Sequence, residues 1–466
     1  MISRGGMRDM LTLPTRMSTN RETTSRIDRF ADAIVQVVPD ALTSSILFLM
    51  VLAGAAWAMG ARPIVIVDSY YRGFWSLLPF TAQMTLIILL GSALSTTPFF
   101  QRLITTLAAK PRTQFEAVAG AVLLSATCSY CFWGLRYAVN PLIAVNFAYQ
   151  ATRRGIRIHF PFFMATVYAA GAVWQYGLSA SAPLLIATPG HFLEKTIGVI
   201  PLSRTIWSPA AILDVVIYLV VIVLFGWRFM PRAERPITEY ADAVALAEAA
   251  PAPHVAPRTY AERLEHHSFF TLVLCGAMAM WLWYHFFEKG AGLNINSLNM
   301  ILFLLTFLLH GNARNVSKAL ARAATGAWPV IVLYHLYAGL TGLIEHTPVG
   351  DRMASLVAAG SSAGTFPFLS AAIGTVFAFF IPSSGGQWAI QGLVTVKAAM
   401  ALNVSVERAM LSMSVGDHMG NLTSPFWYVV VAGVARLDFR SFFGYGLIYA
   451  VIWFVIGVFV FTFAPC

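Results

Sequence analysis

Residues 381–392 read Ile-Pro-Ser-Ser-Gly-Gly-Gln-Trp-Ala-Ile-Gln-Gly, and this stretch decides the fold. It lies between two apolar arms that are each too short to cross a bilayer. Neighbouring Pro, Ser and Gly residues break a helix and leave backbone groups without partners, which lipid tolerates only where those groups line a cavity inside protein. The stretch therefore predicts a polar, irregular turn inside a membrane protein, of the kind that forms substrate or ion sites in transporters.

The composition is that of a protein that crosses the membrane several times. Of its 466 residues 58% are hydrophobic and only 11% are charged, whereas about a quarter of the residues in soluble domains are charged. The net charge of +10 comes from Arg-rich tails and loops. We interpret this charge as a topology signal and a contact with anionic lipid, and we expect no nucleic-acid partner. Cys128 and Cys131 have no second pair or His at zinc spacing, so we expect no metal centre.

Apolar segments predict an all-α fold. Single membrane helices are predicted at 41–61, 74–95, 207–228, 267–287, 295–310, 324–345 and 441–463. Two overlong segments, 158–190 and 405–435, carry Gly, hydroxyl residues and Pro in their middles. These are predicted to be broken transmembrane helices, with the breaks at 177–183 and 420–425.

The same order of segments occurs twice along the chain. The stretches 114–150 and 366–402 are too long for one helix and contain polar turns, so each predicts a re-entrant hairpin. A short amphipathic segment precedes each hairpin, at 98–109 and 349–362. A repeated order of this kind indicates an internal repeat.

The distribution of Lys and Arg predicts the orientation. Positive residues cluster before 30 and between 228 and 263, which places these parts in the cytoplasm, whereas the sparsely charged loops 62–73, 288–294 and 403–408 are predicted outside. The N-terminus is then cytoplasmic, the C-terminus lies outside, and the two repeats are inverted. The predicted parts are a disordered cytoplasmic tail at 1–28, a first inverted repeat at 29–228 with its hairpin at 114–150, a cytoplasmic linker at 229–266, a linking transmembrane helix at 267–294, and a second inverted repeat at 295–466 with its hairpin at 366–402.

Several motifs resemble those of the short-chain fatty acid transporter family. They are the run at 379–392, Tyr-Arg-Gly-Phe-Trp at 71–75, Ser-Ala-Pro-Leu-Leu-Ile-Ala-Thr-Pro-Gly at 181–190, and Gly-Asp-His-Met-Gly-Asn at 416–421 leading into Ser-Pro-Phe-Trp at 424–427. The resemblance implies membership of the ion transporter superfamily, with an elevator-type architecture beside a homodimeric scaffold. It implies a secondary transporter in the cell inner membrane, and not an enzyme, that carries small monocarboxylates such as butyrate or acetoacetate.

The chain departs from the family pattern at two places. The first hairpin tip of the family usually reads Asn-Trp-Gly-Phe-Gly, and here residues 132–136 read Phe-Trp-Gly-Leu-Arg. The family's Gly-Glu-Gln-Trp becomes Gly-Asp-His-Met at 416–419. The positive charge gained at Arg136 leaves open a larger or doubly charged organic anion as the substrate.

Arg136 and Asp417 are the charged residues predicted to lie deepest. At about 1.5 Å per helical residue, Arg136 lies roughly 24 Å from the cytoplasmic surface and Asp417 roughly 18 Å from the outer end of its helix. A guanidinium at that depth needs an anion. Arg136 is therefore either a clamp for the substrate carboxylate or a structural ion-pair partner of Asp417. Asp417 is either the site of the coupling ion or the counter-ion of Arg136. Asp214 and Glu345, nearer to helix ends, are expected to contact interfacial water.

Polar groups at the helix breaks form the predicted substrate site. Free amides at the start of a half-helix attract carboxylates, and unwound carbonyls attract Na⁺. The predicted substrate-binding residues are Trp133, Gly134, Arg136, Ser179, Ser181, Ser383, Ser384, Gly385, Gly386, Gln387, Trp388, Asn421, Thr423 and Ser424. The predicted coupling-ion residue is Asp417, with H⁺ or Na⁺ as the ion and no other cofactor. A channel and an intramembrane enzyme are the alternatives, and no two-His zinc motif supports the enzyme.

Overall fold

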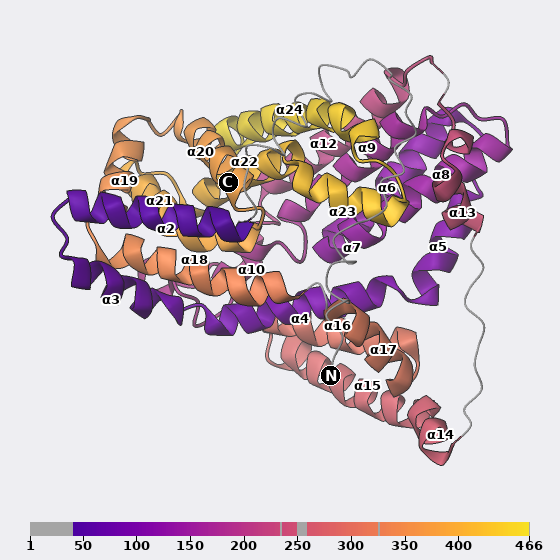
Figure 1. Cartoon of the computed structure of the whole chain (residues 1–466), viewed down its shortest axis with the longest axis horizontal. Coiled ribbons are helices and arrows are strands. Elements are labelled where there is room, and N and C mark those ends of the chain that lie inside the picture. The colour runs from indigo at the N-terminus through magenta and orange to yellow at the C-terminus, as the bar shows by residue number, and fades with distance from the viewer. Residues whose placement is uncertain (1–40, 234, 249–258, 325–326, 466) are drawn as a thin grey trace, which may run out of the picture.

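The computed structural model describes residues 41–233, 235–248, 259–324 and 327–465, and every regular element among them is helical (Figure 1). The predicted tail at 1–28 lies outside the described residues. Within the described ranges five segments are long and apolar enough to cross a membrane: α2 (Ala41–Ala58), α4 (Leu78–Ser95), α12 (Pro209–Arg228), the run Tyr260–Glu288 and α24 (Arg440–Phe463). The all-α class with several apolar spans is therefore confirmed.

One layer of the molecule is formed by α2, α3 (Pro63–Phe74), α4 and α18 (Trp328–His346), which lie side by side in Figure 1. Helix α3 and helix α18 touch through glycines, since a Cβ on Gly73 would lie 2.6 Å from the Cα of Gly342. The prediction that residues 62–73 form a loop is wrong. Pro63 begins a helix there, and its apolar stretch is too short to be recognised as a span from composition.

The two stretches predicted to be hairpins each fold as packed helices. The first consists of α6 (Gln114–Cys131), α7 (Trp133–Ala138) and α8 (Asn140–Arg153), and the second of α20 (Phe366–Phe380) and α21 (Ser384–Ala401). Helices α5 (Pro98–Ala108) and α19 (Val349–Ala359) precede them.

The polar turn of the second stretch is shorter than predicted. Only residues 381–383 lie outside helices, and the remainder of the run forms the first turns of α21. The helix can start this early because the Ser383 hydroxyl accepts a hydrogen bond from the Gly386 amide and so caps it.

Both overlong spans are broken. The first consists of α9 (Phe160–Ala170), the 3₁₀ turn η1 (Gly171–Tyr176) and α10 (Ser181–Ile186), and the second of α22 (Val406–Thr423) and α23 (Pro425–Ala435). The second break lies at Ser424 and not at Gly420, which is helical. Gly420 instead allows α20 to approach, because a Cβ there would lie 2.5 Å from the Cβ of Ala378.

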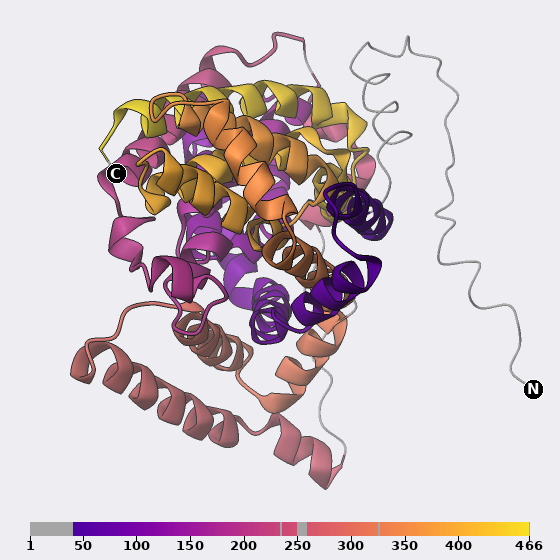
Figure 2. The same cartoon turned by 90° about the vertical axis from the view of Figure 1, so that its left-hand side faces the viewer.

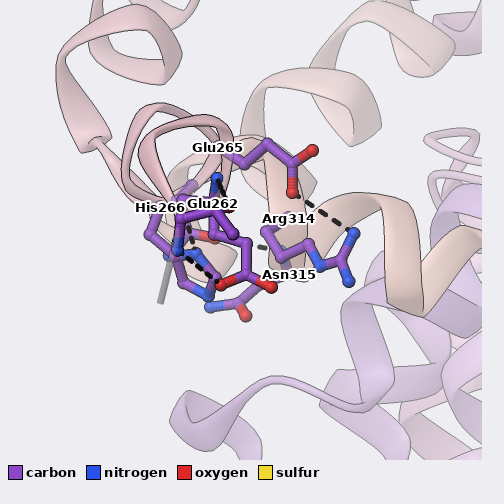
Figure 3. A network of polar contacts seen from close by, with 7 residues as sticks. Glu262, Glu265, His266, Arg314 and Asn315 are labelled. Carbon is purple, nitrogen blue, oxygen red and sulfur yellow. Dashed lines mark hydrogen bonds and ion pairs between the residues drawn. The ribbon is translucent and has the colours of Figure 1, made fainter. Parts of the chain in front are cut away.

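An arm of consecutive helices lies beside α4, at the bottom of Figure 2. It consists of α14 (Tyr260–His266), α15 (Ser268–Trp283), the π-helical turn η4 (Tyr284–Glu288), α16 (Ile295–His310) and α17 (Ala313–Ala324). Arg314 of α17 forms an ion pair of 3.2 Å with Glu265 of α14 (Figure 3). The Asn315 amide donates to the His310 carbonyl. This network joins the two ends of the arm.

The short elements α11 (Glu194–Ile197), η2 (Leu202–Arg204), η3 (Ile237–Glu239) and α13 (Ala241–Glu248) complete the described chain. The order of long helix, short helix, helix pair and broken helix occurs in both halves. The inverted relation of the halves and the division of the chain into repeats and linker remain predictions.

Candidate functional site

A cavity of about 370 Å³ lies where the helix breaks meet α4 and α18. On one side it is lined by residues from the tips of both helix pairs and from both broken helices. Met84 of α4 and Leu333, Tyr334 and Tyr337 of α18 form the opposite side. The predicted site residues that line the cavity are Trp133, Ser181, Ser383, Ser384, Gly385 and Asn421.

Aromatic rings form one wall of the cavity. Tyr137 stacks on Trp427 with the ring centroids 4.1 Å apart, and Trp133 lies 6.1 Å from Trp174. All four rings line the cavity. Their faces are suited to the apolar body of a ligand. Of these four residues, only Trp133 is predicted from the sequence to bind the substrate. Trp427 belongs to the Ser-Pro-Phe-Trp motif at 424–427 but was assigned no role in the site. Trp174 lies just before the first helix break.

A buried polar network connects this wall to Asp417. The fully buried Asp417 carboxylate accepts hydrogen bonds from the Gln175 amide and, at 3.2 Å, from the Asn421 amide. The Ser384 hydroxyl donates to Gln175 Oε1 at 3.3 Å, and Trp427 Nε1 donates to Asn421 Oδ1 at 2.8 Å. Asn421 alone therefore connects the carboxylate to the cavity on one path, and Gln175 followed by Ser384 connects it on the other.

Gln175 is a buried polar residue that is not among the predicted site residues. Its signal was a lone amide in an apolar segment immediately before the Gly177 break. In the structure it is buried and joins the first broken helix both to Asp417 of the second and to the tip at Ser384.

Arg136 is fully buried behind the aromatic wall and does not line the cavity. Its guanidinium lies over the Tyr168 ring, 4.5 Å from the centroid, and Nη1 is 3.4 Å from His418 Nδ1. Its Nε and Nη2 have no hydrogen-bond partner among the described residues. No acidic oxygen of the described chain lies within ion-pair distance of it, so the structural pair with Asp417 is absent from this conformation. The carboxylate clamp remains a prediction.

The start of α21 presents its positive end to the cavity. Ser384 and Gly385 are its first two residues, and both line the cavity. The Ser383 hydroxyl is held 3.0 Å from the Tyr334 hydroxyl of α18. A helix N-terminus with unpaired amides attracts anions, so this end of the cavity is suited to a carboxylate.

The other predicted site residues support the tips and breaks without lining the cavity. Ser179 accepts from the Trp133 amide at 2.8 Å and so ties the first tip to the first break. Gln387 donates to the Gly374 carbonyl at 2.9 Å and joins the arms of the second pair. Two glycines face aromatic rings: Gly134 faces Phe132, and Gly386 faces Tyr337. Trp388 is fully buried. Thr423 donates to the Met419 carbonyl, and Ser424 caps α23.

Comparison with known proteins gives the family. The model of the short chain fatty acid transporter family matches residues 23–464. The chain belongs to this family. It is 29% identical over 440 residues to a protein of Escherichia coli (strain K12) provisionally named a short-chain fatty acid transporter, covering 93% of this chain and 99% of that protein. A Haemophilus influenzae protein (strain ATCC 51907 / DSM 11121 / KW20 / Rd) with the same provisional name is 27% identical over 452 residues, with the same coverage.

The fold is similar to that of a solved transporter. The crystal structure of the Alcanivorax borkumensis YdaH transporter, described as having an unusual topology, matches with a TM-score of 0.55 and 16% identity, covering 91% of this chain and 98% of that one. At this identity the match concerns the fold alone. Its family and its apolar helices together make this chain a multi-pass membrane transporter and not an enzyme.

Proposed function

We propose that this chain is a secondary active transporter of small monocarboxylates that works by elevator-like alternating access. The observation that carries the proposal is the position of the cavity, between the helix breaks on one side and α4 and α18 on the other. Sites at such a boundary are exposed to either side of the membrane when one body moves against the other. The proposal includes a homodimer in the cell inner membrane, with inverted repeats, the N-terminus in the cytoplasm and the C-terminus outside.

The substrate carboxylate binds at the start of α21 and its carbon chain lies against the aromatic wall. The amides of Ser384 and Gly385 and the hydroxyl of Ser181 provide the polar end of this site. The rings of Trp133 and Trp427 provide its apolar side. A single carboxylate on a short apolar chain matches this division between a polar and an apolar end.

Asp417 couples the substrate to an ion, H⁺ or Na⁺. A cation or proton that binds to the Asp417 carboxylate changes the charge of the group that accepts the hydrogen bond from Gln175. Gln175 in turn accepts a hydrogen bond from Ser384, which lines the cavity. Binding at Asp417 and binding in the cavity therefore share one hydrogen-bond network, which is the requirement for energetic coupling between two sites.

A larger organic acid is the second candidate substrate, and the cavity volume favours it. At about 30 Å³ per water molecule in the liquid, about 370 Å³ corresponds to about twelve waters. A four-carbon acid has six non-hydrogen atoms and leaves part of this space to water. Acids with longer or aromatic chains fill it.

Uptake into proteoliposomes tests the proposal. Purified protein is reconstituted and given labelled monocarboxylates of two to eight carbons, an aryl carboxylate and a dicarboxylate, each with an imposed Na⁺ or proton gradient. We expect saturable uptake of at least one monocarboxylate above protein-free liposomes, increased by one of the two gradients. Uptake that is linear in concentration indicates a channel, and the absence of uptake for every acid contradicts the proposal.

A further inference from the structure

Asp214 of α12 is a buried acid that the site described above does not use. Its side chain is completely buried, and neither carboxyl oxygen has a hydrogen-bond partner among the described residues. It shares its helix face with Ala210, Ala211 and Tyr218, all buried, and the Tyr218 hydroxyl already donates to the Ala169 carbonyl. The expected contact of Asp214 with interfacial water is therefore wrong, because the neighbouring helices cover it.

Among the described residues, the helices packed most extensively on α12 place no charged side chain beside Asp214. Those helices are α6, α9, η1 and α24. The titratable groups on them are Glu116, Cys128, Tyr130 and Cys131 of α6, Tyr168 of α9, Tyr176 of η1, and Arg440, Tyr445 and Tyr449 of α24.

The two ionic groups in that set lie near the opposite end of α12. A Cβ on Gly226, twelve residues after Asp214, would lie 3.3 Å from the Val118 side chain, which places Glu116 at that end. The Tyr449 ring lies 5.5 Å from the Phe225 ring, so Arg440, nine residues earlier in α24, is also distant from Asp214. The groups nearer to Asp214 are thiols and phenols.

An ionised carboxylate in this position has no compensation. Removing such a charge from water without a partner costs far more free energy than burying a neutral carboxylic acid, which loses only its hydrogen bonds with water. The neutral form is therefore the one that fits the structure. Buried ionisable residues of membrane helices commonly belong to proton or ion pathways.

Asp214 also lies close to one end of its helix, and a chain of packed side chains connects its surroundings to those of Asp417. It follows Pro209 by five residues, about 7.5 Å of helix, and its carboxyl reaches water only where the helices that cover it move apart. The Tyr218 ring one turn further lies 4.9 Å from the Trp453 ring, and Trp453 lies 5.1 Å from His418, the neighbour of Asp417.

We infer that Asp214 is a proton-binding site of the transport cycle. It holds a proton in the conformation described here and releases it in a conformation where its carboxyl reaches water, so that a proton moves with the substrate. The transport step of this inference rests on the proposed function. The protonation of Asp214 does not depend on the proposed function.

The transport test uses Asp214→Asn, which retains the shape of the neutral acid but cannot exchange a proton. Wild type and variant are compared in proteoliposomes for substrate exchange without a gradient and for accumulation driven by an imposed pH gradient. We expect exchange within about twofold of wild type and gradient-driven accumulation reduced to the level without a gradient. Glu345→Gln, an exposed acid of α18, is the matched control and keeps both activities. Unchanged gradient-driven accumulation in Asp214→Asn overturns the inference.

A chemical test on the wild-type protein covers the case in which Asp214→Asn fails to fold. Dicyclohexylcarbodiimide adds to protonated carboxyls in apolar surroundings, and the adduct is located by mass spectrometry. We expect labelling of Asp214 during turnover at neutral pH. An unlabelled Asp214 peptide overturns the inference. If Asp214 is labelled but the protein transports no carboxylic acid, the proposed function is overturned and the assignment of a proton-binding site at Asp214 is retained.

Discussion

Replacing Gly386 by alanine tests whether the tip of the second helix pair must fit against α18 during transport. A Cβ at Gly386 would lie 2.5 and 2.6 Å from two ring carbons of Tyr337, where ordinary contacts are 3.4–4 Å. Tyr337 is fully buried, so the contact is relieved only by moving the tip or by moving the ring toward the cavity that it lines. Overpacking of this kind typically costs about 1–3 kcal/mol, which corresponds to an about 5- to 150-fold loss in the population of the conformation described here.

The assay is the initial uptake rate per inserted protein in proteoliposomes. Gly386→Ala is expected to insert and to transport at least fivefold more slowly, and Gly386→Leu is expected to insert and not transport. Gly433→Ala of α23, whose added Cβ would meet nothing within 4 Å, is the control. In a double-mutant cycle, the smaller Tyr337→Leu should partly restore the rate of Gly386→Ala. Wild-type rates in Gly386→Ala would refute the reasoning.

The remaining predictions concern orientation, charge and selectivity. A cysteine in place of Gly290 should react with an impermeant thiol reagent from outside, and one in place of Ala245 only from inside; equal accessibility contradicts the inverted repeats. Because Arg136 and Asp417 form no direct ion pair, the effects of Arg136→Ala and Asp417→Asn on thermal stability and uptake should add, and rescue by the double variant would support a structural pair. Trp133→Ala should raise the Michaelis constant most for the longest acids, and an equal change for all chain lengths would exclude Trp133 from the apolar wall.

The helix breaks could be predicted from the sequence because their signals are local. Pro382 cannot continue α20 and Ser383 is suited to cap α21, so the break lies within the stretch that the sequence indicates. Gly420 was misinterpreted because glycine serves two purposes. It marks a helix end in some proteins and a close helix contact in others, and only the position of α20 distinguishes the two.

The composition of the site could be predicted only in part. Ser384 and Asn421 line the cavity because they stand at breaks. Gln175 and Trp174 are in a helical segment, and their role depends on the packing of η1 against α22, which no local pattern contains. Counting helical residues predicts a deep position for Arg136, and its side chain is fully buried within the protein. Its depth in the membrane stays a prediction. The same counting failed for Asp214, because the distance to a helix end does not indicate which helices cover it.

Counterflow in proteoliposomes tests the central claim most directly. Vesicles containing the purified protein are loaded with an unlabelled monocarboxylate that the uptake panel identifies and are diluted into a trace of the labelled acid. A carrier that binds the acid in the cavity at Ser384 should accumulate label transiently above equilibrium, and Ser384→Val, which removes the hydroxyl bonded to Gln175, should reduce this peak at least fivefold. Label that rises to equilibrium without an overshoot in the wild type would contradict a carrier, and an unchanged peak in Ser384→Val would contradict this cavity as its site.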